Sequence, residues 1–287
     1  MAAGVPLSAP LPRSSAPAGG ALARRVISAA ALLPLAVYVV AFAPSWAFAL
    51  VVLAVGALSQ WELAQLLERG GVPTFPLLAV VSGAVVTASF AARELQPLAL
   101  TAVFGAALTA GLFQRGDLAG AWRPVAATLL GVGYVGWLLG HALWLRALPG
   151  GAEWMLLLVA VTSVGEIAAY AVGSTVGRRK LAPRVSPGKT VEGAVAQLAA
   201  SLVTGVLGLH WLLPAEPPAL GALIGLCLGV AGQIGDLVES LLKRSVGSKD
   251  AGQLIPGHGG ILDRIDGLLF NTPVLYYLVA HARSVGA

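Results

Sequence analysis

The chain has 287 residues, of which 57% are hydrophobic and only 11% are charged. Soluble globular proteins carry about 25% charged residues, so this composition, with a mean hydropathy of +0.83, excludes an ordinary soluble domain. The formal net charge is +5. In a membrane protein, such an excess usually comes from the basic loop residues that set its orientation, so we expect no nucleic-acid partner.

Apolar segments of about 20 residues recur along the chain, which is the pattern of membrane-spanning helices. A transmembrane β-barrel would instead show short segments of alternating hydrophobicity, and the sequence has none. The single cysteine, Cys227, excludes an intrachain disulfide. We therefore predict an all-α, polytopic integral membrane protein.

The first 43 residues contain two different segments. Residues 1–22 are rich in Ala, Pro, Ser and Gly and have no acidic residue, which predicts a disordered tail. The following stretch, RRVISAAALLPLAVYVVAFAP, resembles a signal peptide with an Ala41-Phe42-Ala43 cleavage site. Pro44 directly after that site disfavours cleavage, and the apolar stretch is long enough to span, so we predict a first transmembrane helix instead.

Hydropathy predicts nine spans in chain order, divided between an N-terminal group (23–150) and a C-terminal group (151–287) that contains the two long loops. The predicted spans are 26–43, 45–66, 74–91, 97–113, 124–146, 153–174, 192–213, 219–242 and 261–281. Small residues line many of these segments, which is compatible with a homodimer as well as with ordinary helix packing.

The basic residues predict the orientation of the chain. With a cytoplasmic N-terminus and nine spans, fifteen of the eighteen basic residues fall inside, and only Arg93, Arg146 and Arg283 fall outside. This is the bias expected from the positive-inside rule. The Ala- and Gly-rich composition suggests a bacterial inner membrane. Two long loops, 175–191 and 243–260, then lie on the cytoplasmic side, where nucleotides are found.

The first long loop carries the sequence SPGKTVEG. We interpret Ser186-Pro187-Gly188 as a turn and expect Thr190 to cap the helix that follows. The segment is not a Walker A motif, because Pro183 stands where that motif requires a glycine and no strand precedes it. It is a basic segment that could still hold phosphate.

Acidic residues interrupt the last two predicted spans. Asp236, Glu239 and Lys243 lie at i, i+3 and i+7, on one stripe of a helix, and Asp263 and Asp266 repeat the i, i+3 spacing. An ionised side chain at the bilayer centre costs about 2.5–3.5 kcal/mol, and paired carboxylates repel one another. A hard divalent cation such as Mg²⁺, which prefers oxygen ligands, would resolve both problems.

The loop between these spans supplies groups that bind anions. Ion pairing with basic neighbours explains any one of the acids, but it is a weaker explanation for four acids on two adjacent helix ends. Glycines would let backbone amides approach a phosphate, and the N-terminal end of the ninth helix faces the same place. The loop glycines and cations are Gly247, Gly252, Gly257, Gly259 and Gly260, with Lys243, Arg244 and Lys249. The combination favours phosphoryl or nucleotidyl transfer.

The run SLLKRSVGSKDAGQLIPGHGGILDRID closely resembles the signature of the phosphatidate cytidylyltransferases, the CDP-diacylglycerol synthases. The matching residues are Ser240, Lys243, Arg244, Lys249, Asp250, His258, Gly259, Gly260, Asp263, Arg264 and Asp266. The upstream SPGKTVEG is similar to a second segment of that family and contributes Ser186, Lys189, Thr190 and Glu192. The likeness is strong over residues 160–270 and weak before them.

One element departs from the family pattern. Where the family usually has Asp-x-Gly-Ala-Tyr, this chain reads GEIAAYAVG, so that Glu166 stands for the aspartate and Ala168 for the glycine. The carboxylate is kept but is one methylene longer, which changes its geometry if it contacts nucleotide or metal.

The resemblance implies that CTP and phosphatidic acid react to give CDP-diacylglycerol and pyrophosphate. It implies that Asp236, Asp263 and Asp266 hold one or two Mg²⁺ ions, with a monovalent cation also compatible, and that Lys243 organises these acids or contacts phosphate. Glu239 and Glu166 are further candidates. The expected nucleotide- and phosphate-binding residues are Ser186, Lys189, Thr190, Glu192, Arg244, Lys249, Asp250, His258, Gly259, Gly260 and Arg264.

Three other functions share some of these sequence features. DRIDG fits the start of the CDP-alcohol phosphotransferase motif, but the residues that follow Gly267 do not continue it. A CTP-dependent lipid kinase matches less well. A cation- or proton-coupled transporter would explain intramembrane acids such as Asp236 and Glu239, but the sequence shows no inverted repeat and the acids lie near one membrane face.

Overall fold

The computed structural model describes residues 34–114, 118–252, 254 and 259–285. The predicted disordered tail (1–22) and His258 lie outside these residues, as does most of the first predicted span, of which residues 34–42 are helical.

The described chain is built almost entirely of helices. Each predicted span from 45–66 onward corresponds to one helix or to one run of consecutive helical segments. The elements are α2 (Ser45–Arg69), α3 (Pro76–Ser89), η1 (Arg93–Leu95), α4 (Gln96–Leu112), η2 (Leu118–Gly120), α5 (Trp122–Gly131), η3 (Val132–Trp137), α6 (Leu138–Ala147), α7 (Gly151–Thr175), β1 (Lys180–Ala182), β2 (Ser186–Thr190), α8 (Val191–Leu212), α9 (Pro218–Ser245) and α10 (Leu262–Val285).

Six helical segments of the described chain are long and apolar enough to cross a membrane. They are 45–69, 93–112, 122–147, 151–175, 191–212 and 218–245. The third of these is α5 and α6 joined by the π-helical turn η3. The α3 helix is apolar but only 14 residues long, and α10 carries Asp263, Asp266 and an internal Pro273. The prediction of a multi-pass, helical membrane protein is therefore confirmed.

Local sequence explains where several helices begin. Prolines occupy the first turn of α3, α4 and α9, where a missing amide hydrogen costs nothing. Thr190 caps α8 as predicted, because its Oγ1 accepts a hydrogen bond from the Gly193 amide at 3.1 Å. The α6 and α7 helices are separated at Gly150, whose φ of +70° lies in the left-handed region that favours glycine.

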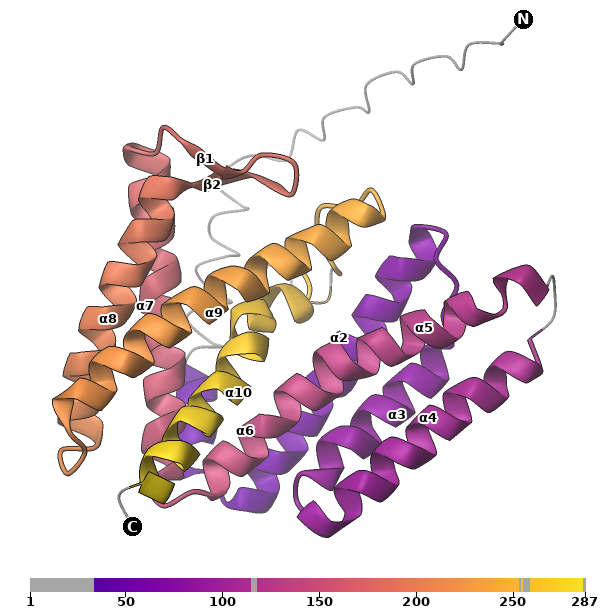
Figure 1. The fold of residues 1–287 in the computed structure, drawn as a ribbon, viewed down its shortest axis with the longest axis horizontal. Helices are drawn as coiled ribbons and strands as arrows, with labels where there is room; N and C mark the ends of the chain where they lie inside the picture. The colour runs from indigo at the N-terminus through magenta and orange to yellow at the C-terminus, as the bar shows by residue number, and fades with distance from the viewer. Residues whose placement is uncertain (1–33, 115–117, 253, 255–258, 286–287) are drawn as a thin grey trace, which may run out of the picture.

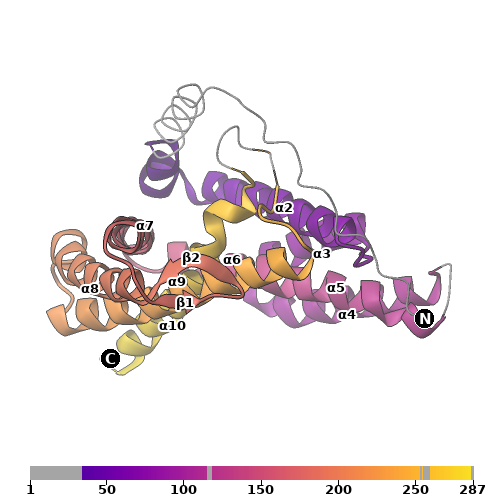
Figure 2. The ribbon, with the colours of Figure 1, turned by 90° about the horizontal axis from the view of Figure 1, so that it is seen from above.

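The helices form two groups with α6 and α10 between them. In Figure 1, α7, α8 and α9 lie on one side and α2, α3, α4 and α5 on the other. The α10 helix packs against α9, α6, α7 and α2, so it joins the two groups. Figure 2 shows the same arrangement from above, with the β-hairpin over α8 and α9. Fully buried apolar side chains on α7 and α10, such as Leu157, Leu158 and Leu269, form the centre of the core.

Glycines bring the backbones of α8 and α9 into direct contact. A Cβ atom at Gly225 would lie 2.4 Å from the carbonyl oxygen of Ser201, and one at Gly205 would lie 2.4 Å from that of Gly221. Gly221, Gly225 and Gly229 are spaced four residues apart, so they share one face of α9. Small residues at such a seam are the usual means of packing helices in lipid, where the helices gain no hydrophobic energy from association.

The all-α prediction omitted a short β-hairpin in the loop 175–191. Strands β1 and β2 are antiparallel, with Lys180 opposite Thr190 and Ala182 opposite Ser186. The predicted turn at Ser186-Pro187-Gly188 is therefore wrong, since these residues belong to β2 and the turn is at 183–185. Pro187 is tolerated because a two-stranded hairpin has only edge strands.

The α8–α9 seam generates a stability prediction. Gly225→Val would force a branched side chain against the Ser201 carbonyl and should lower the free energy of unfolding by about 1–3 kcal/mol. Thermal unfolding of the purified protein in detergent measures this. The control is Gly105→Val on α4, where a Cβ atom meets no other atom within 4 Å. Equal melting temperatures for the two variants would contradict the contact.

Candidate active site

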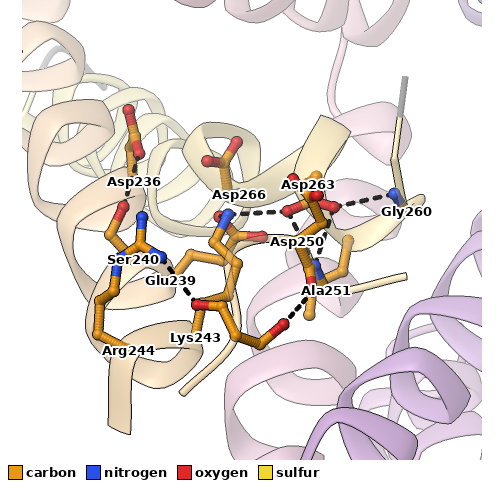
Figure 3. A network of polar contacts seen from close by, with 12 residues as sticks. Asp236, Glu239, Ser240, Lys243, Arg244, Asp250, Ala251, Gly260, Asp263 and Asp266 are labelled. Carbon is orange, nitrogen blue, oxygen red and sulfur yellow. Dashed lines mark hydrogen bonds and ion pairs between the residues drawn. The ribbon is translucent and has the colours of Figure 1, made fainter. Parts of the chain in front are cut away.

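Three carboxylates from α9 and α10 converge near one end of the helix bundle. Asp236, Glu239 and Asp266 each offer an oxygen within 4.8 Å of the other two. Figure 3 shows Asp236 and Glu239 on α9 and Asp266 across from them on α10. Glu239 is only 1% exposed, and its Oε1 has no hydrogen-bond partner among the described residues. Such a set of oxygens has the chemistry of a site for a hard divalent cation.

Lys243 joins α9 to α10 through two buried ion pairs. Its Nζ lies 2.5 Å from Glu239 Oε2 and 2.8 Å from Asp263 Oδ1. The side chains of the three residues are 13%, 1% and 7% exposed, respectively. One cation thus offsets two acids that would otherwise repel each other in a poorly solvated place.

Asp263 also organises the loop that precedes α10. The amides of Ala251 and Gly260 donate hydrogen bonds to Asp263 Oδ2, at 3.1 and 2.9 Å (Figure 3). Gly259 has φ +80°, and a Cβ atom there would lie 2.9 Å from the same oxygen. Both Asp263 oxygens are therefore engaged with the protein, and so is the Gly260 amide that the sequence suggested for phosphate binding.

The geometry groups the acids differently from the sequence-based set. That set was Asp236, Asp263 and Asp266, whereas Glu239, a weaker candidate, takes the place of Asp263 in the converging cluster. Asp263 lines the neighbouring cavity but is held by Lys243 and the loop. The sequence showed only that all four acids lie near the ends of their helices, and which of them Lys243 would pair with was not readable.

A cavity of about 460 Å³ opens beside the carboxylates. It is enclosed by α7, α8, α9, the start of α10 and the hairpin. Its polar lining consists of Glu166, Tyr170, Ser174, Ser186, Lys189, Thr190, Gln197, Gln233, Asp236, Asp263 and Asp266. This volume is within the range of small-molecule sites, which is about 300–1,000 Å³.

The hairpin places a lysine at the mouth of the carboxylate cluster. Lys189 Nζ lies 2.6 Å from Asp236 Oδ2, and the two side chains are 24% and 37% exposed. Ser186 and Thr190 also line the cavity. Glu192 instead accepts hydrogen bonds from the amides of Arg178 and Arg179, at 3.1 and 3.2 Å, and so fixes the base of the hairpin.

The remaining predicted phosphate-binding residues lie around this centre. Arg244 Nη1 donates to the carbonyl of Ser248 at 2.9 Å, and Ser248 Oγ donates to the carbonyl of Asp250 at 2.9 Å. Arg264 and Lys249 are exposed. None of the four predicted residues, Arg244, Lys249, Asp250 and Arg264, lines the cavity. Glu166 does line it, facing Gly267 on α10, where a Cβ atom would lie 2.7 Å from Glu166 Oε1.

Sequence reasoning missed three polar groups at this end of the bundle. Gln197 and Gln233 line the cavity, and Gln233 Nε2 donates to the carbonyl of Ala194 at 2.9 Å. Glu62 on α2 accepts a hydrogen bond from the amide of Leu262 at 2.9 Å. Neutral glutamines in apolar helices give little signal, but an acid such as Glu62 inside a predicted span is by itself a reason to suspect a role.

The fold and the site together define a multi-pass membrane protein with an acid-lined cavity at one end of its helix bundle. Comparison with known proteins identifies its family: the profile described as "Cytidylyltransferase family" matches residues 23–282. The chain therefore belongs to the cytidylyltransferase family, and the resemblance found in its motifs is confirmed.

Several relatives share part of the chain. "Uncharacterized protein YnbB" of Escherichia coli is 43% identical over 184 residues, which are 61% of this chain and 60% of the relative. A phosphatidate cytidylyltransferase of Synechocystis sp. is 46% identical over 131 residues, covering 46% of this chain and 44% of the relative. One from Bacillus subtilis is 51% identical over 113 residues, covering 39% and 42%. The chain thus aligns with roughly half the length of these relatives.

The buried position of Lys243 generates a second prediction. Lys243→Met should leave Glu239 and Asp263 without their shared cation and cost about 3–5 kcal/mol of stability. The matched control is Lys189→Met, whose partly exposed pair with Asp236 should contribute about 0–1 kcal/mol. Thermal unfolding in detergent compares the two. A smaller loss for Lys243→Met than for its control would contradict the buried bridge.

Proposed function

We propose that the protein is a phosphatidate cytidylyltransferase, which transfers the cytidylyl group of CTP to phosphatidic acid for phospholipid synthesis. The observation that carries the proposal is the meeting of Asp236, Glu239 and Asp266 beside Lys189 and a cavity of about 460 Å³. Family membership and the names of the Synechocystis and Bacillus relatives support the choice of CTP and phosphatidic acid.

The reaction needs no covalent enzyme intermediate. A phosphate oxygen of phosphatidic acid attacks the α-phosphorus of CTP, the new P–O–P bond forms, and the bond to the β-phosphate oxygen breaks to release pyrophosphate. The attacking phosphate already carries negative charge at neutral pH, so a strong general base is dispensable. The task of the protein is to position two anions and stabilise the charge that moves onto the leaving group.

The carboxylate cluster fits a divalent cation, and we propose Mg²⁺. Its oxygens are the ligands that Mg²⁺ prefers, and the substrate phosphates would complete the coordination. When bound, Mg²⁺ neutralises phosphate charge and stabilises the attacking and leaving oxygens. Asp236, Glu239 and Asp266 would hold it, with Asp263 positioned alongside by Lys243.

Cationic groups of the chain would bind the triphosphate. Lys189 pairs with Asp236 in this structure and is close enough to the cavity to exchange that carboxylate for a phosphate. Ser186 and Thr190 would orient the nucleotide from the hairpin. Arg244, Lys249 and Arg264 do not line the cavity as it stands, and they would add positive charge to its surroundings. Glu192 supports the hairpin that carries these residues.

We propose that the lipid enters sideways between helices, with its chains remaining in hydrocarbon. Tyr170 lines the cavity and is also 78% exposed on the outer surface of α7, and its neighbour Ile167 is 67% exposed. An apolar, outward-facing wall beside a charged cavity suits a substrate with a phosphate head and acyl chains.

We further propose nine spans in the bacterial inner membrane, with the N-terminus and the active site cytoplasmic. In this topology α2 and α9 both end on the cytoplasmic side. Their C-terminal ends do lie together, since a Cβ atom at Gly70 would be 2.2 Å from the side chain of Val246. The hairpin lies at the same end of the bundle as the C-terminal end of α9 (Figure 1), and its Lys189 pairs with Asp236 of the carboxylate cluster. A homodimer stays a prediction.

The proposed activity is tested with purified protein, labelled CTP, Mg²⁺ and phosphatidic acid. The wild type should give lipid-soluble label, chelation by EDTA should abolish it, and added Mg²⁺ should restore it. Asp266→Asn removes one of the three charges that face the cation and should lower turnover by about 10²–10³-fold. Asp263→Asn should lose turnover while staying folded.

The control for these variants is Glu94→Gln, an exposed acid on η1 far from the carboxylate cluster, which should keep wild-type turnover. Wild-type protein that incorporates no label from CTP would refute the proposed function. Full activity of Asp266→Asn would instead refute the assignment of the cation site.

The proposed topology is tested with single cysteines in a Cys227→Ser background. A membrane-impermeant maleimide applied to intact spheroplasts should label Glu94→Cys, which is on the outer side in this topology, and should label Glu68→Cys only after permeabilisation. Both side chains are exposed in the structure. The reverse labelling pattern would rule out a cytoplasmic N-terminus with nine spans.

A further inference from the structure

We propose that Glu62, on α2, is a positioning residue for the catalytic end of α10. Its carboxylate holds the first amide of that helix and the glycine loop before it, and thereby sets the direction in which Asp263 and Asp266 point. This inference rests on the proposed function, and it gives the N-terminal helix group a part in a site that otherwise comes from α7 to α10.

The contact is direct and buried. Glu62 is 3% exposed, and its Oε2 accepts a hydrogen bond from the Leu262 amide at 2.9 Å across 200 residues of sequence. Leu262 is the first residue of α10, and its amide is one of those that the helix itself leaves unsatisfied. An acidic side chain at a helix N-terminus also interacts favourably with the helix dipole.

Two loop glycines pack closely against the same carboxylate. A Cβ atom at Gly252 would lie 2.2 Å from Glu62 Oε1, and one at Gly260 would lie 2.6 Å from Glu62 Oε2. Neither glycine has a positive φ, so their backbone conformations are open to other residues. The need for glycine at these two positions therefore comes from the space that Glu62 occupies.

The segment that Glu62 contacts is next to the acids of the proposed active site. Asp263 follows Leu262 directly, and the Gly260 amide donates to Asp263 at 2.9 Å. Asp266 stands one turn further along α10 and belongs to the carboxylate cluster. A shift of about 1 Å in such groups can cost about 10²-fold in rate, so an anchor at Leu262 is well placed to control turnover.

The first experiment compares Glu62→Ala and Glu62→Gln with the wild type in the full chain. The control is Glu68→Gln, because Glu68 lies on the same helix but is exposed, and its carboxylate accepts a hydrogen bond only from Thr74 among the described residues. We expect turnover to fall about 10–100-fold in Glu62→Ala, and to fall less in Glu62→Gln, which keeps an acceptor oxygen. Glu68→Gln should match the wild type.

Amide hydrogen exchange supplies a readout that does not depend on activity. Peptides covering residues 259–266 should exchange faster in Glu62→Ala than in the wild type or Glu68→Gln, whereas peptides from α8 should not change. Unchanged exchange in this segment would overturn the inference. Faster exchange with wild-type turnover would overturn it as well, because the contact would then not serve catalysis.

The two proposals fail in different ways. A wild-type protein without cytidylyltransferase activity refutes the proposed function, while the exchange data still decide whether Glu62 holds the start of α10. If the alanine variant does not fold, its amide exchange rises throughout the chain. A double-mutant cycle then tests whether Glu62 and the loop act together.

The cycle uses the tight fit between Glu62 and Gly252. Gly252→Ala alone should push the carboxylate aside and lower turnover by about tenfold or more. Glu62→Asp retracts the carboxylate by one methylene, so the double variant should recover at least about threefold relative to Gly252→Ala. Losses that simply multiply in the double variant would show that the two positions act independently, against the inference.

Discussion

The site depends on one lysine that serves two acids. Lys243 reaches Glu239 on its own helix and Asp263 on the next, and so ties the end of α9 to the start of α10. Without that cation the two carboxylates would meet in a nearly dry place, which is costly. With it, Asp236 and Asp266 face the cavity. Asp263, held by Lys243, in turn accepts hydrogen bonds from two amides of the loop.

This arrangement explains why so much of the charge in a very apolar chain is concentrated in one region. The exposed faces of membrane-spanning helices meet lipid, where each charge is expensive. At the α9–α10 junction, Lys243 offsets the charges of the buried Glu239 and Asp263. Lys189 extends the set of ion pairs from the hairpin to Asp236. The apolar helices thus act as a frame that presents a small polar pocket at one end.

Part of this could be read from the sequence, and part could not. Span positions follow from hydropathy, and the Thr190 cap is a contact over three residues, so both were predictable. The hairpin was missed because its pairing depends on residues up to ten positions apart in a polar stretch without strand periodicity. Two features depend on tertiary geometry, which no local spacing encodes. Glu239, and not the predicted Asp263, completes the carboxylate cluster, and Glu62 contacts the amide of Leu262.

The glycine seam between α8 and α9 bears on how homologous sequences should be compared. At Gly225 the neighbouring backbone occupies the place of any side chain, so even a single methyl group is excluded there. Such a position has almost no freedom to drift, although it performs no chemistry. Invariance of this glycine among relatives would record a steric boundary, and ranking residues by invariance alone would mistake it for part of the catalytic apparatus.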